Sequence, residues 1–331
     1  MTKQDLRIVY MGTPEFAVAG LQALVEGGYN VVGVVTMPDK PAGRGHKIQY
    51  SPVKEYALAQ GLKVMQPERL KDEAFVEELR ACRADLQIVV AFRMLPEVVW
   101  AMPEYGTFNV HGSLLPQYRG AAPINWAIIN GDKETGLTTF MLKHEIDTGN
   151  IILQERIAIG EDEDAGSVHD RLMELSRSMV TRTTDLIIDC ADRGCELPVT
   201  PQPECDELRP APKIFKEDCE IRFAEMTAEQ VKNFVRGLSP YPAAWANLTI
   251  NGKQFDGVKI YAVEVTGYGL QVTGYGLRVT GYGLRVTGKG LRVTGKGDII
   301  IPCREGAVRI LELQAPGKKR MDAKSFLNGL H

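Results

Sequence analysis

The chain has 331 residues, of which 44% are hydrophobic and 24% charged, a balance typical of a globular protein. This length is more than one hydrophobic core usually serves, so we expect two domains. No run of about 18 apolar residues indicates a membrane span, and the first residues lack the apolar segment of a secretory signal. We therefore expect a cytoplasmic protein without a membrane partner.

The net charge of −3 conceals an uneven distribution along the chain. Residues 266–331 contain eleven Lys or Arg and four Asp or Glu, a balance of +7, which leaves −10 for the first 265 residues. A basic end on an acidic body favours a polyanionic partner such as nucleic acid. The alternative is that these basic residues are solvated side chains in loops.

The first third of the chain alternates predicted strands and helices. Residues 6–12 form an apolar run that ends in glycine, which is typical of a buried parallel strand. Thr13 is a predicted N-cap, and Pro14 suits the first turn of the helix that follows. Further helices are expected at 51–62 and 72–84, and further strands at 29–36, 62–67, 85–92 and 106–113.

This alternation predicts an α/β fold with a Rossmann-like, doubly wound and mostly parallel sheet. The turn after the first strand, Gly12-Thr13-Pro14, lacks the GxGxxG pattern, which argues against a dinucleotide cofactor. In such sheets ligands bind beyond the carboxyl ends of the strands. The segment NVHGS at residues 109–113 lies at such an end.

The second part of the chain differs in composition. A helix is expected at 170–194 and closes the first domain, residues 1–192. Five prolines between 198 and 212 exclude a continuous helix or central strand, so residues 193–212 are predicted to be a linker. Residues 213–331 predict a smaller, β-rich and barrel-like domain. Its expected elements are a helix at 227–240 and strands at 244–250, 258–267 and 307–317.

Residues 265–297 repeat with a period of seven, beginning VTGYGLQ and VTGYGLR. In each unit Leu and the next Val share one face of an extended chain, while Arg and Thr share the other. The Gly-Tyr-Gly sequence permits a tight turn. We expect short strands stacked side by side, as a meander or a coil, and we favour a passive extension over an arm that binds RNA.

The six cysteines indicate neither a metal site nor a disulfide framework. They show no CxxC spacing and no nearby histidine pair, so we expect reduced thiols and no bound metal. They are Cys82, Cys190, Cys195, Cys205, Cys219 and Cys303.

Asn109 and His111 are two residues apart at the end of a predicted strand, so their side chains share one face. Asp147, in the segment EIDTGNII, belongs to a predicted turn. These residue types suit acyl transfer to an amine, because an amide and an imidazole can donate to an oxyanion. The imidazole can also accept the proton of the amine, and a carboxylate can orient it. His144 is a second candidate imidazole.

The strings FNVHGSLLPQYRGAAPINWAI and IDTGNII resemble the folate-dependent formyltransferase family. GTPEFA near the start and PDKPAGRGHKIQYSPVK at 38–54 are similar to the members that act on methionyl initiator tRNA. The similarity covers nearly the whole chain and is interrupted by the repeat. It implies transfer of the formyl group of 10-formyltetrahydrofolate, the donor substrate, to the α-amine of methionyl initiator tRNA. The family's catalytic residues fall on Asn109, His111 and Asp147.

The resemblance also implies where the folate binds. The pterin is expected beside the segment AFRMLP, where many members carry a small glycine-containing turn in place of Arg93 and Met94. Ser113 has a second interpretation, as a cap at the end of its strand. The expected folate residues are Phe92, Arg93, Met94, Leu95, Ser113, Leu114, Leu115 and Pro116.

The tRNA is expected to contact both ends of the chain. The loop at 38–49 resembles the family's element that reaches the acceptor stem, and the family's second domain is OB-like and binds tRNA. The segment APGKKRM is a second candidate phosphate contact, or a solvated turn. The expected tRNA residues are Lys40, Arg44, Lys47, Lys318, Lys319 and Arg320.

Two other functions are weighed against this one. A sugar-nucleotide N-formyltransferase uses the same Asn-His-Asp chemistry on an amino sugar, but the AGRG loop and the basic second domain disfavour it. A non-catalytic RNA-binding protein with a damaged second domain is disfavoured by the intact Asn109, His111 and Asp147. We expect a monomer, and the sequence leaves the effect of the repeat on tRNA binding open.

Overall fold

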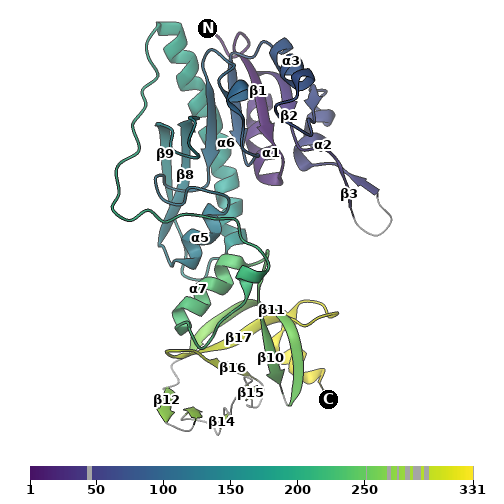
Figure 1. The fold of residues 1–331 in the computed structure, drawn as a ribbon, viewed down its shortest axis with the longest axis vertical. Coiled ribbons are helices and arrows are strands. Elements are labelled where there is room, and N and C mark those ends of the chain that lie inside the picture. The colour runs from purple at the N-terminus through teal and green to yellow at the C-terminus, as the bar shows by residue number, and fades with distance from the viewer. Residues whose placement is uncertain are drawn as a thin grey trace. The chain divides into compact units, whose positions relative to one another are not determined.

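The computed structural model describes residues 1–42, 47–250, 252–266, 270–273, 276–279, 284–285, 292–293 and 298–330. These residues form two compact units, each assembled from several stretches of the chain (Figure 1). The predicted linker, residues 193–212, packs with unit 1, and the roles of the units as catalytic and tRNA-binding domains stay a prediction. Unit 1 comprises Met1–Pro123, Thr135–Ile157 and His169–Pro212, and unit 2 comprises Ile124–Glu134, Ala158–Val168 and Lys213–His331.

Unit 1 is built on a seven-stranded sheet with the strand order β5-β2-β1-β6-β7-β8-β9. The predicted Rossmann-like, mostly parallel sheet is thereby confirmed: every pairing among the first five strands of this order is parallel, and β8 joins β7 in antiparallel orientation. The bounds are β1 (Arg7–Gly12), β2 (Asn30–Val35), β5 (Val64–Met65), β6 (Leu86–Val90), β7 (Thr107–His111), β8 (Glu134–Met141) and β9 (Ile151–Ala158).

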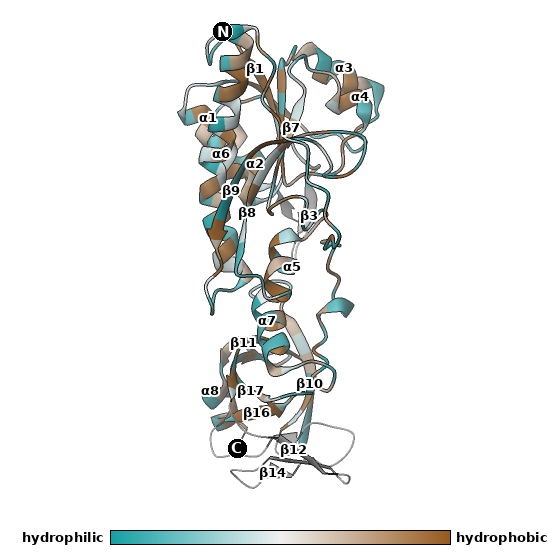
Figure 2. Cartoon of the chain, turned by 90° about the vertical axis from the view of Figure 1, so that its left-hand side faces the viewer, coloured by the Kyte–Doolittle hydropathy of each residue, from teal (hydrophilic) through white to brown (hydrophobic). Residues whose placement is uncertain are grey.

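Helices cover both faces of this sheet, which explains why its strands β1, β2 and β6 are largely apolar. Val9 and Met11 pack with apolar residues of α3 (Glu73–Ala81) and α4 (Glu97–Trp100). Tyr10 points to the opposite face, where its hydroxyl donates to the Ala17 carbonyl of α1 (Glu15–Glu26) at 2.6 Å. Figure 2 shows α1 and α6 (Ala165–Arg193) on one side of the sheet and α3 and α4 on the other.

A side-chain cap holds the start of one helix, whereas the N-cap predicted for another is wrong. Ser51 caps α2 (Pro52–Ala59), because its hydroxyl oxygen accepts from the Lys54 amide at 3.1 Å. Thr13 is not the N-cap of α1: the cap residue is Pro14, which offers no side-chain hydrogen bond. The prediction failed because the proline holds an extended backbone and delays the helix by one residue.

The predicted loop at 38–49 contains a short hairpin between β3 (Lys40–Ala42) and β4 (Lys47–Gln49). At its base, Lys54 Nζ donates to Asp39 Oδ2 at 2.5 Å, and Gln66 Nε2 donates to Asp39 Oδ1 at 2.8 Å. The prediction for Arg44 lies outside the described residues.

Unit 2 has a β-rich core, as the composition predicts. The antiparallel strands β10 (Ala244–Ile250), β11 (Lys253–Thr266), β17 (Ala307–Gln314) and β16 (Ile299–Pro302) lie side by side in this order. Buried residues of α7 (Ala228–Leu238) pack against them. An OB-like fold stays a prediction. Smaller elements are α5 (Pro123–Ile129), a 3-10 turn (Glu217–Cys219), β18 (Met321–Asp322) and α8 (Ala323–Asn328).

Part of the heptad repeat lies within the described residues. β12 (Leu270–Thr273), β13 (Gly276–Val279) and β14 (Leu284–Arg285) are antiparallel neighbours in chain order. The backbone of β15 (Arg292–Val293) pairs in parallel with β10. The remaining repeat residues lie outside the described part of the chain, and the interpretation of the repeat as an insertion stays a prediction.

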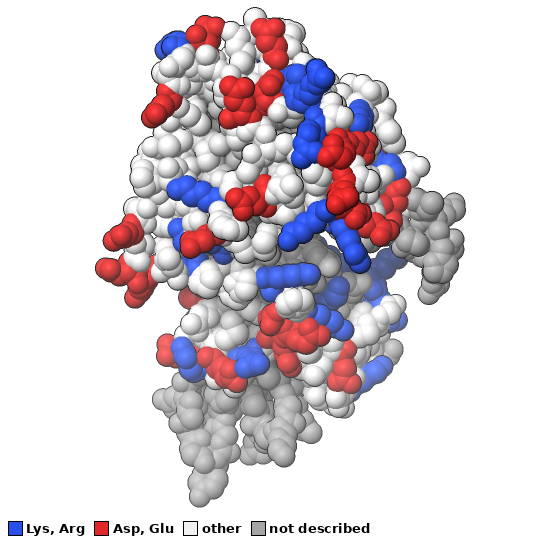
Figure 3. All heavy atoms as spheres, turned by 45° about the horizontal axis from the view of Figure 1, so that its top comes forward, with Lys and Arg blue, Asp and Glu red and all other residues white. Residues whose placement is uncertain are grey.

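Ion pairs offset part of the positive charge near the C-terminal end. Arg309 pairs with Glu264 and, at 3.6 Å, with Asp298, and Arg320 forms two hydrogen bonds with Glu312. On the face drawn in Figure 3, basic side chains are interspersed with acidic ones.

Among the described residues, no helix combines the length and hydrophobicity that crossing a membrane requires.

Candidate active site

Asn109 and His111 come from the last half of β7, between β6 and β8. The two-residue repeat of a strand directs both side chains to the same face, as predicted. His111 is buried, with 6% of its surface exposed, whereas Asn109 is half-buried. Within the described part of the chain, the Asn109 side chain makes no hydrogen bond. Its amide therefore remains available to a ligand.

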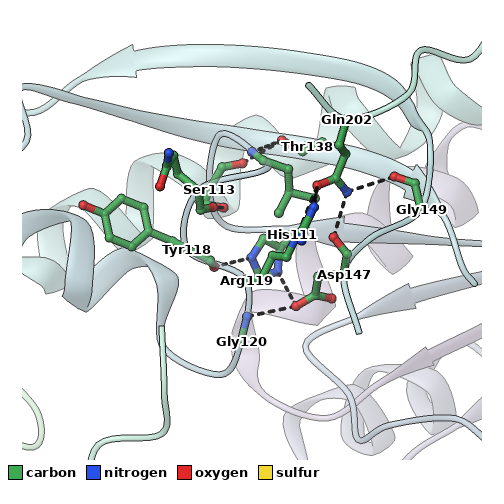
Figure 4. Close-up of polar contacts among 11 residues, drawn as sticks. His111, Ser113, Tyr118, Arg119, Gly120, Thr138, Asp147, Gly149 and Gln202 are labelled. Carbon is green, nitrogen blue, oxygen red and sulfur yellow. Dashed lines mark hydrogen bonds and ion pairs between the residues drawn. The ribbon is translucent and has the colours of Figure 1, made fainter. Parts of the chain in front are cut away.

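Both ring nitrogens of His111 have defined neighbours (Figure 4). Nε2 lies 2.8 Å from the carbonyl oxygen of Tyr118. Because a carbonyl oxygen only accepts, Nε2 is the donor and carries a proton. Nδ1 faces Asp147 Oδ2 at 3.9 Å, which is too long for a direct hydrogen bond. The nitrogen that can exchange a proton is therefore Nδ1, on the side of the carboxylate.

Asp147 lies in the turn between β8 and β9, and its side chain is largely buried. Its Oδ2 accepts a hydrogen bond from the Gly120 amide at 3.0 Å. Asp147 has a φ of 54°, and Tyr118 a φ of 61°, so both lie in the left-handed region that non-glycine residues seldom occupy. Gly149 lies in the same turn. A side chain does not fit there, because a Cβ would lie 1.6 Å from the Met141 carbonyl oxygen.

The turn after His111 is held by a separate set of hydrogen bonds. Ser113 is fully buried, and its hydroxyl donates to the Gln117 carbonyl at 2.7 Å. Thr138 Oγ1 donates to the Ser113 carbonyl at 2.7 Å and accepts from the Leu115 amide at 3.2 Å. These contacts give Ser113 the turn-capping role that the sequence offered as its second interpretation. Its folate role, and those of Leu114, Leu115 and Pro116, stay predictions.

The predicted pterin segment follows β6. Met94 is 73% exposed, Phe92 is half-buried, and Leu95 is buried. Arg93 donates to the carbonyls of Pro67 and Glu68, the latter at 2.8 Å, so its guanidinium ties this segment to the one after β5. Burial lowers the pKa of Arg93. Folate contacts by these residues stay predictions.

His144, the second candidate imidazole, is not part of this cluster. Its side chain is 85% exposed, and Nε2 lies 3.8 Å from Glu97 Oε2. The structure thus brings Asp147 and His111 together and leaves His144 at the surface.

The predicted tRNA residues lie in two places. Lys40 and Lys47 belong to the β3–β4 hairpin of unit 1. Lys318 and Lys319 are exposed in a turn of unit 2, whereas Arg320 stacks 4.2 Å from the centre of the Tyr261 ring and binds Glu312. The hydrogen bonds to Glu312 raise the pKa of Arg320. tRNA contacts by all these residues stay predictions.

Sequence reasoning missed three contributors to the site. Two are main-chain groups, the Tyr118 carbonyl and the Gly120 amide. Main-chain contacts of this kind cannot be predicted from residue type. The third is Gln202, whose side chain contacts Arg119 and the main chain at Asp147 and Gly149. Its place among prolines predicted a linker. Only the polarity of its side chain indicated that it could form hydrogen bonds with the site.

The whole chain is similar to known formyl transferases. The family model for formyl transferases matches residues 6–184, and the model for their C-terminal domain matches residues 213–331. A methionyl-tRNA formyltransferase of Bacteroides fragilis is 54% identical over 331 residues, covering 100% of this chain and 97% of that protein. Its counterpart in Flavobacterium johnsoniae is 48% identical over 327 residues, covering 99% and 97%.

Solved structures share the fold at low identity. WlaRD, a sugar 3N-formyl transferase, has a TM-score of 0.62 and 18% identity, covering 95% of this chain and 99% of that one. HypX from Aquifex aeolicus in complex with tetrahydrofolic acid has a TM-score of 0.58 and 17% identity, covering 97% of this chain and 47% of that one.

Proposed function

We infer that this chain, which belongs to the formyl transferase family, catalyses the reaction for which the two relatives described above are named. It transfers the formyl group of 10-formyltetrahydrofolate to the α-amine of methionyl initiator tRNA, which produces formylmethionyl-tRNA for translation initiation. The observation that carries this conclusion is 54% identity to a methionyl-tRNA formyltransferase over the whole length of the chain. The folate is the donor substrate rather than a resident cofactor.

The residues of unit 1 suit each step of this transfer. The amine nitrogen attacks the formyl carbon, the carbonyl oxygen becomes an oxyanion, and the bond between the formyl carbon and N10 then breaks. Asn109 donates its amide N–H to the oxyanion, a role supported by the lack of another partner for that amide among the described residues. An oxyanion donor of this kind is typically worth about 10²–10³ in kcat.

His111 moves the proton in this proposal. Its Nε2–H is held by the Tyr118 carbonyl, so Nδ1 accepts the proton that the amine gives up. Asp147, 3.9 Å from Nδ1, stabilises the charged ring while the oxyanion exists. The same proton passes to N10 as the tetrahydrofolate leaves, which balances the transfer.

The finer assignments are parts of the same proposal. Residues 92–95 and 113–116 hold the folate, and Lys40, Arg44 and Lys47 of the segment 38–49 contact the acceptor stem. Unit 2 is an OB-like tRNA-binding domain, where Lys318, Lys319 and Arg320 face phosphate, and the repeat at 265–297 is an insertion in it. The enzyme acts as a monomer in the cytoplasm, where its tRNA substrate is charged and used.

A test of the acceptor separates the proposal from its main alternative. The purified chain is given 10-formyltetrahydrofolate with methionyl initiator tRNA or with a dTDP-linked amino sugar. We expect formylation of the tRNA and none of the sugar above background. Efficient formylation of the sugar with no product on the tRNA would assign the chain to the sugar N-formyltransferases, with which it shares its fold.

A further inference from the structure

The segment 200–211, predicted as part of a linker, is fastened along the candidate active site within unit 1. Thr200 and Ile151 exchange two backbone hydrogen bonds of 2.8 Å. Arg209 accepts from the Tyr118 amide at 2.7 Å, and Ala211 donates to the Arg119 carbonyl at 2.9 Å. Gly120 has a φ of 128° and lacks a Cβ, which would lie 2.4 Å from the Ala211 carbonyl oxygen. We name this segment the strap.

The strap runs beside the residues that hold the two titratable groups. Tyr118 supplies the carbonyl that accepts from His111, and Gly120 supplies the amide that donates to Asp147. Arg119 lies between them in the sequence. Both His111 and Asp147 therefore have a main-chain partner in the loop along which the strap runs.

Gln202 is the strap residue that turns inward. Gln202 is half-buried, whereas all the remaining residues from 201 to 210 are exposed. Its Nε2 donates to the carbonyls of Asp147 at 2.7 Å and Gly149 at 2.9 Å. Its Oε1 accepts from Arg119 Nε at 3.1 Å and Nη2 at 2.6 Å. The side-chain amide thus uses both donors and accepts twice (Figure 4).

Two of these four hydrogen bonds hold the main chain of the Asp147 turn in its conformation. A non-glycine residue in the left-handed region costs on the order of 1–3 kcal/mol and persists only where its surroundings fix it. Gln202 donates hydrogen bonds to the main-chain carbonyls on both sides of Thr148, while the Gly120 amide donates to the Asp147 carboxylate. Two loops that carry the site are thereby joined through one side chain.

We propose that Gln202 is a positioning residue for formyl transfer, which sets the separation between Asp147 and His111 Nδ1 through its contacts to the Asp147 turn and to Arg119. This inference rests on the proposed function, in which Asp147 stabilises the charged ring. A displacement of about 1 Å in a catalytic group can cost about 10²-fold in rate. Gln202 itself touches neither substrate nor the reacting atoms in this account.

The test compares Gln202→Met with the matched control Gln117→Met. Gln117 also fastens the strap, by hydrogen bonds to the Glu207 carbonyl at 3.0 Å and the Arg209 amide at 2.9 Å, but its side chain does not contact Asp147 or Arg119. We expect Gln202→Met to lower kcat by about 10–100-fold with the KM of both substrates nearly unchanged, because geometry rather than binding is lost. Gln117→Met should keep most of the activity.

A double-mutant cycle with Asp147→Asn shows whether Gln202 acts through Asp147. If it does, Gln202→Met should add little loss in the Asp147→Asn background, since coupled residues are non-additive. Equal losses in Gln202→Met and Gln117→Met, or a Gln202→Met loss that multiplies fully with that of Asp147→Asn, would overturn the inference. Full activity of Asp147→Asn alone would instead refute the proposed role of Asp147.

A second variant keeps the test decisive if Gln202→Met folds poorly. Gln202→Glu retains acceptors for Arg119 but cannot donate to the carbonyls of Asp147 and Gly149. It should show the same drop in kcat with an unfolding temperature close to that of the parent chain. A Gln202→Glu enzyme with unchanged kcat would contradict the inference.

Discussion

The orientation of His111 follows from the chemistry of a single neighbour. The Tyr118 carbonyl can only accept, so it fixes a proton on Nε2 and directs the free lone pair of the neutral ring, on Nδ1, toward Asp147. On protonation Nδ1 becomes a donor, and Asp147 Oδ2, at 3.9 Å, is the acceptor that it faces. One residue thus has separate nitrogens for anchoring and for proton transfer.

The cysteine thiols give a residue-level prediction about pH. Burial raises the pKa of Cys303 to about 11 and also raises the pKa values of Cys82 and Cys219. A raised thiol pKa means less thiolate at a given pH, so these three should resist alkylation at pH 8, whereas exposed Cys195 and Cys205 should react. Mass spectrometry of alkylated peptides measures this.

Alkylation in denaturant serves as the control for the thiol experiment, because all six cysteines are free and should then react. Labelling of Cys303 in the folded chain as fast as Cys195 would show that the core of unit 2 opens more readily than its burial indicates.

Part of the arrangement of the candidate site could be predicted from residue spacing together with the family resemblance. Asn109 and His111 were found because a strand places alternate residues on one face, and Asp147 because an acidic residue in a turn complements an imidazole. The Tyr118 carbonyl and the Gly120 amide could not be found, since main-chain groups are common to all residues. Gln202 was missed because the fold, rather than the local sequence, brings it to Asp147.

At the scale of elements, the base of the β3–β4 hairpin holds an ion pair between buried Lys54 and half-buried Asp39. Lys54 is largely buried, donates to Asp39, and lies 3.9 Å from the centre of the Tyr50 ring. The hydrogen bond from Lys54, with a second from Gln66, lowers the pKa of Asp39. Asp39 precedes the hairpin and Lys54 follows it, so the pair fixes both ends.

We predict that Lys54→Met weakens tRNA binding and spares the chemistry. Without the pair, the hairpin base loosens, and about 1 kcal/mol of lost binding free energy corresponds to roughly a fivefold higher KM for tRNA. The values of kcat and of the KM for folate should be unchanged. Steady-state kinetics with each substrate varied in turn measures kcat and the two KM values separately.

Lys63→Met is the matched control for the hairpin experiment, because Lys63 pairs with Glu78 at 3.1 Å on the exposed surface, where an ion pair contributes little. The lowered pKa of Asp39 means that its contribution is present above the unfolded pKa and is lost as pH falls through the folded value. The effect of Lys54→Met should therefore be constant between pH 6 and 8. A fall in kcat with an unchanged tRNA KM would contradict this account.

The predictability of the elements depended on their burial. The inner strands of the seven-stranded sheet are covered on both faces, so β1, β2 and β6 appear as apolar runs that the sequence reveals. The short strands β3 and β4 were predicted as a loop. Each has only three residues, Lys-Pro-Ala and Lys-Ile-Gln, and neither forms an apolar run. The strap was predicted as linker because prolines exclude regular structure, although they do not prevent an extended segment from packing.

At the scale of the whole molecule, we predict that the repeat is dispensable. The buried core described for unit 2 is supplied by β10, β11, β16, β17 and α7. Deletion of Val272–Arg292 removes three whole heptads and leaves the flanking pattern in phase. The shortened chain should keep its kcat and its unfolding temperature, as measured by formylation and by thermal melting.

The deletion also tests whether the repeat binds RNA. A passive extension predicts the same KM for tRNA in both forms at every salt concentration. A KM that rises several-fold on deletion, most strongly at low salt, would mean that basic residues of the repeat contact phosphate, and the prediction of a passive repeat would be wrong.

The most direct measurement is formylation of methionyl initiator tRNA from 10-formyltetrahydrofolate by the full chain and by Asn109→Ala, at saturating concentrations of both substrates. We expect rapid formation of formylmethionyl-tRNA by the parent chain and a loss of about 10²–10³ in kcat for the variant, because one oxyanion donor is removed. A well-folded parent chain that forms no formylmethionyl-tRNA, or a variant as fast as the parent, would contradict the account.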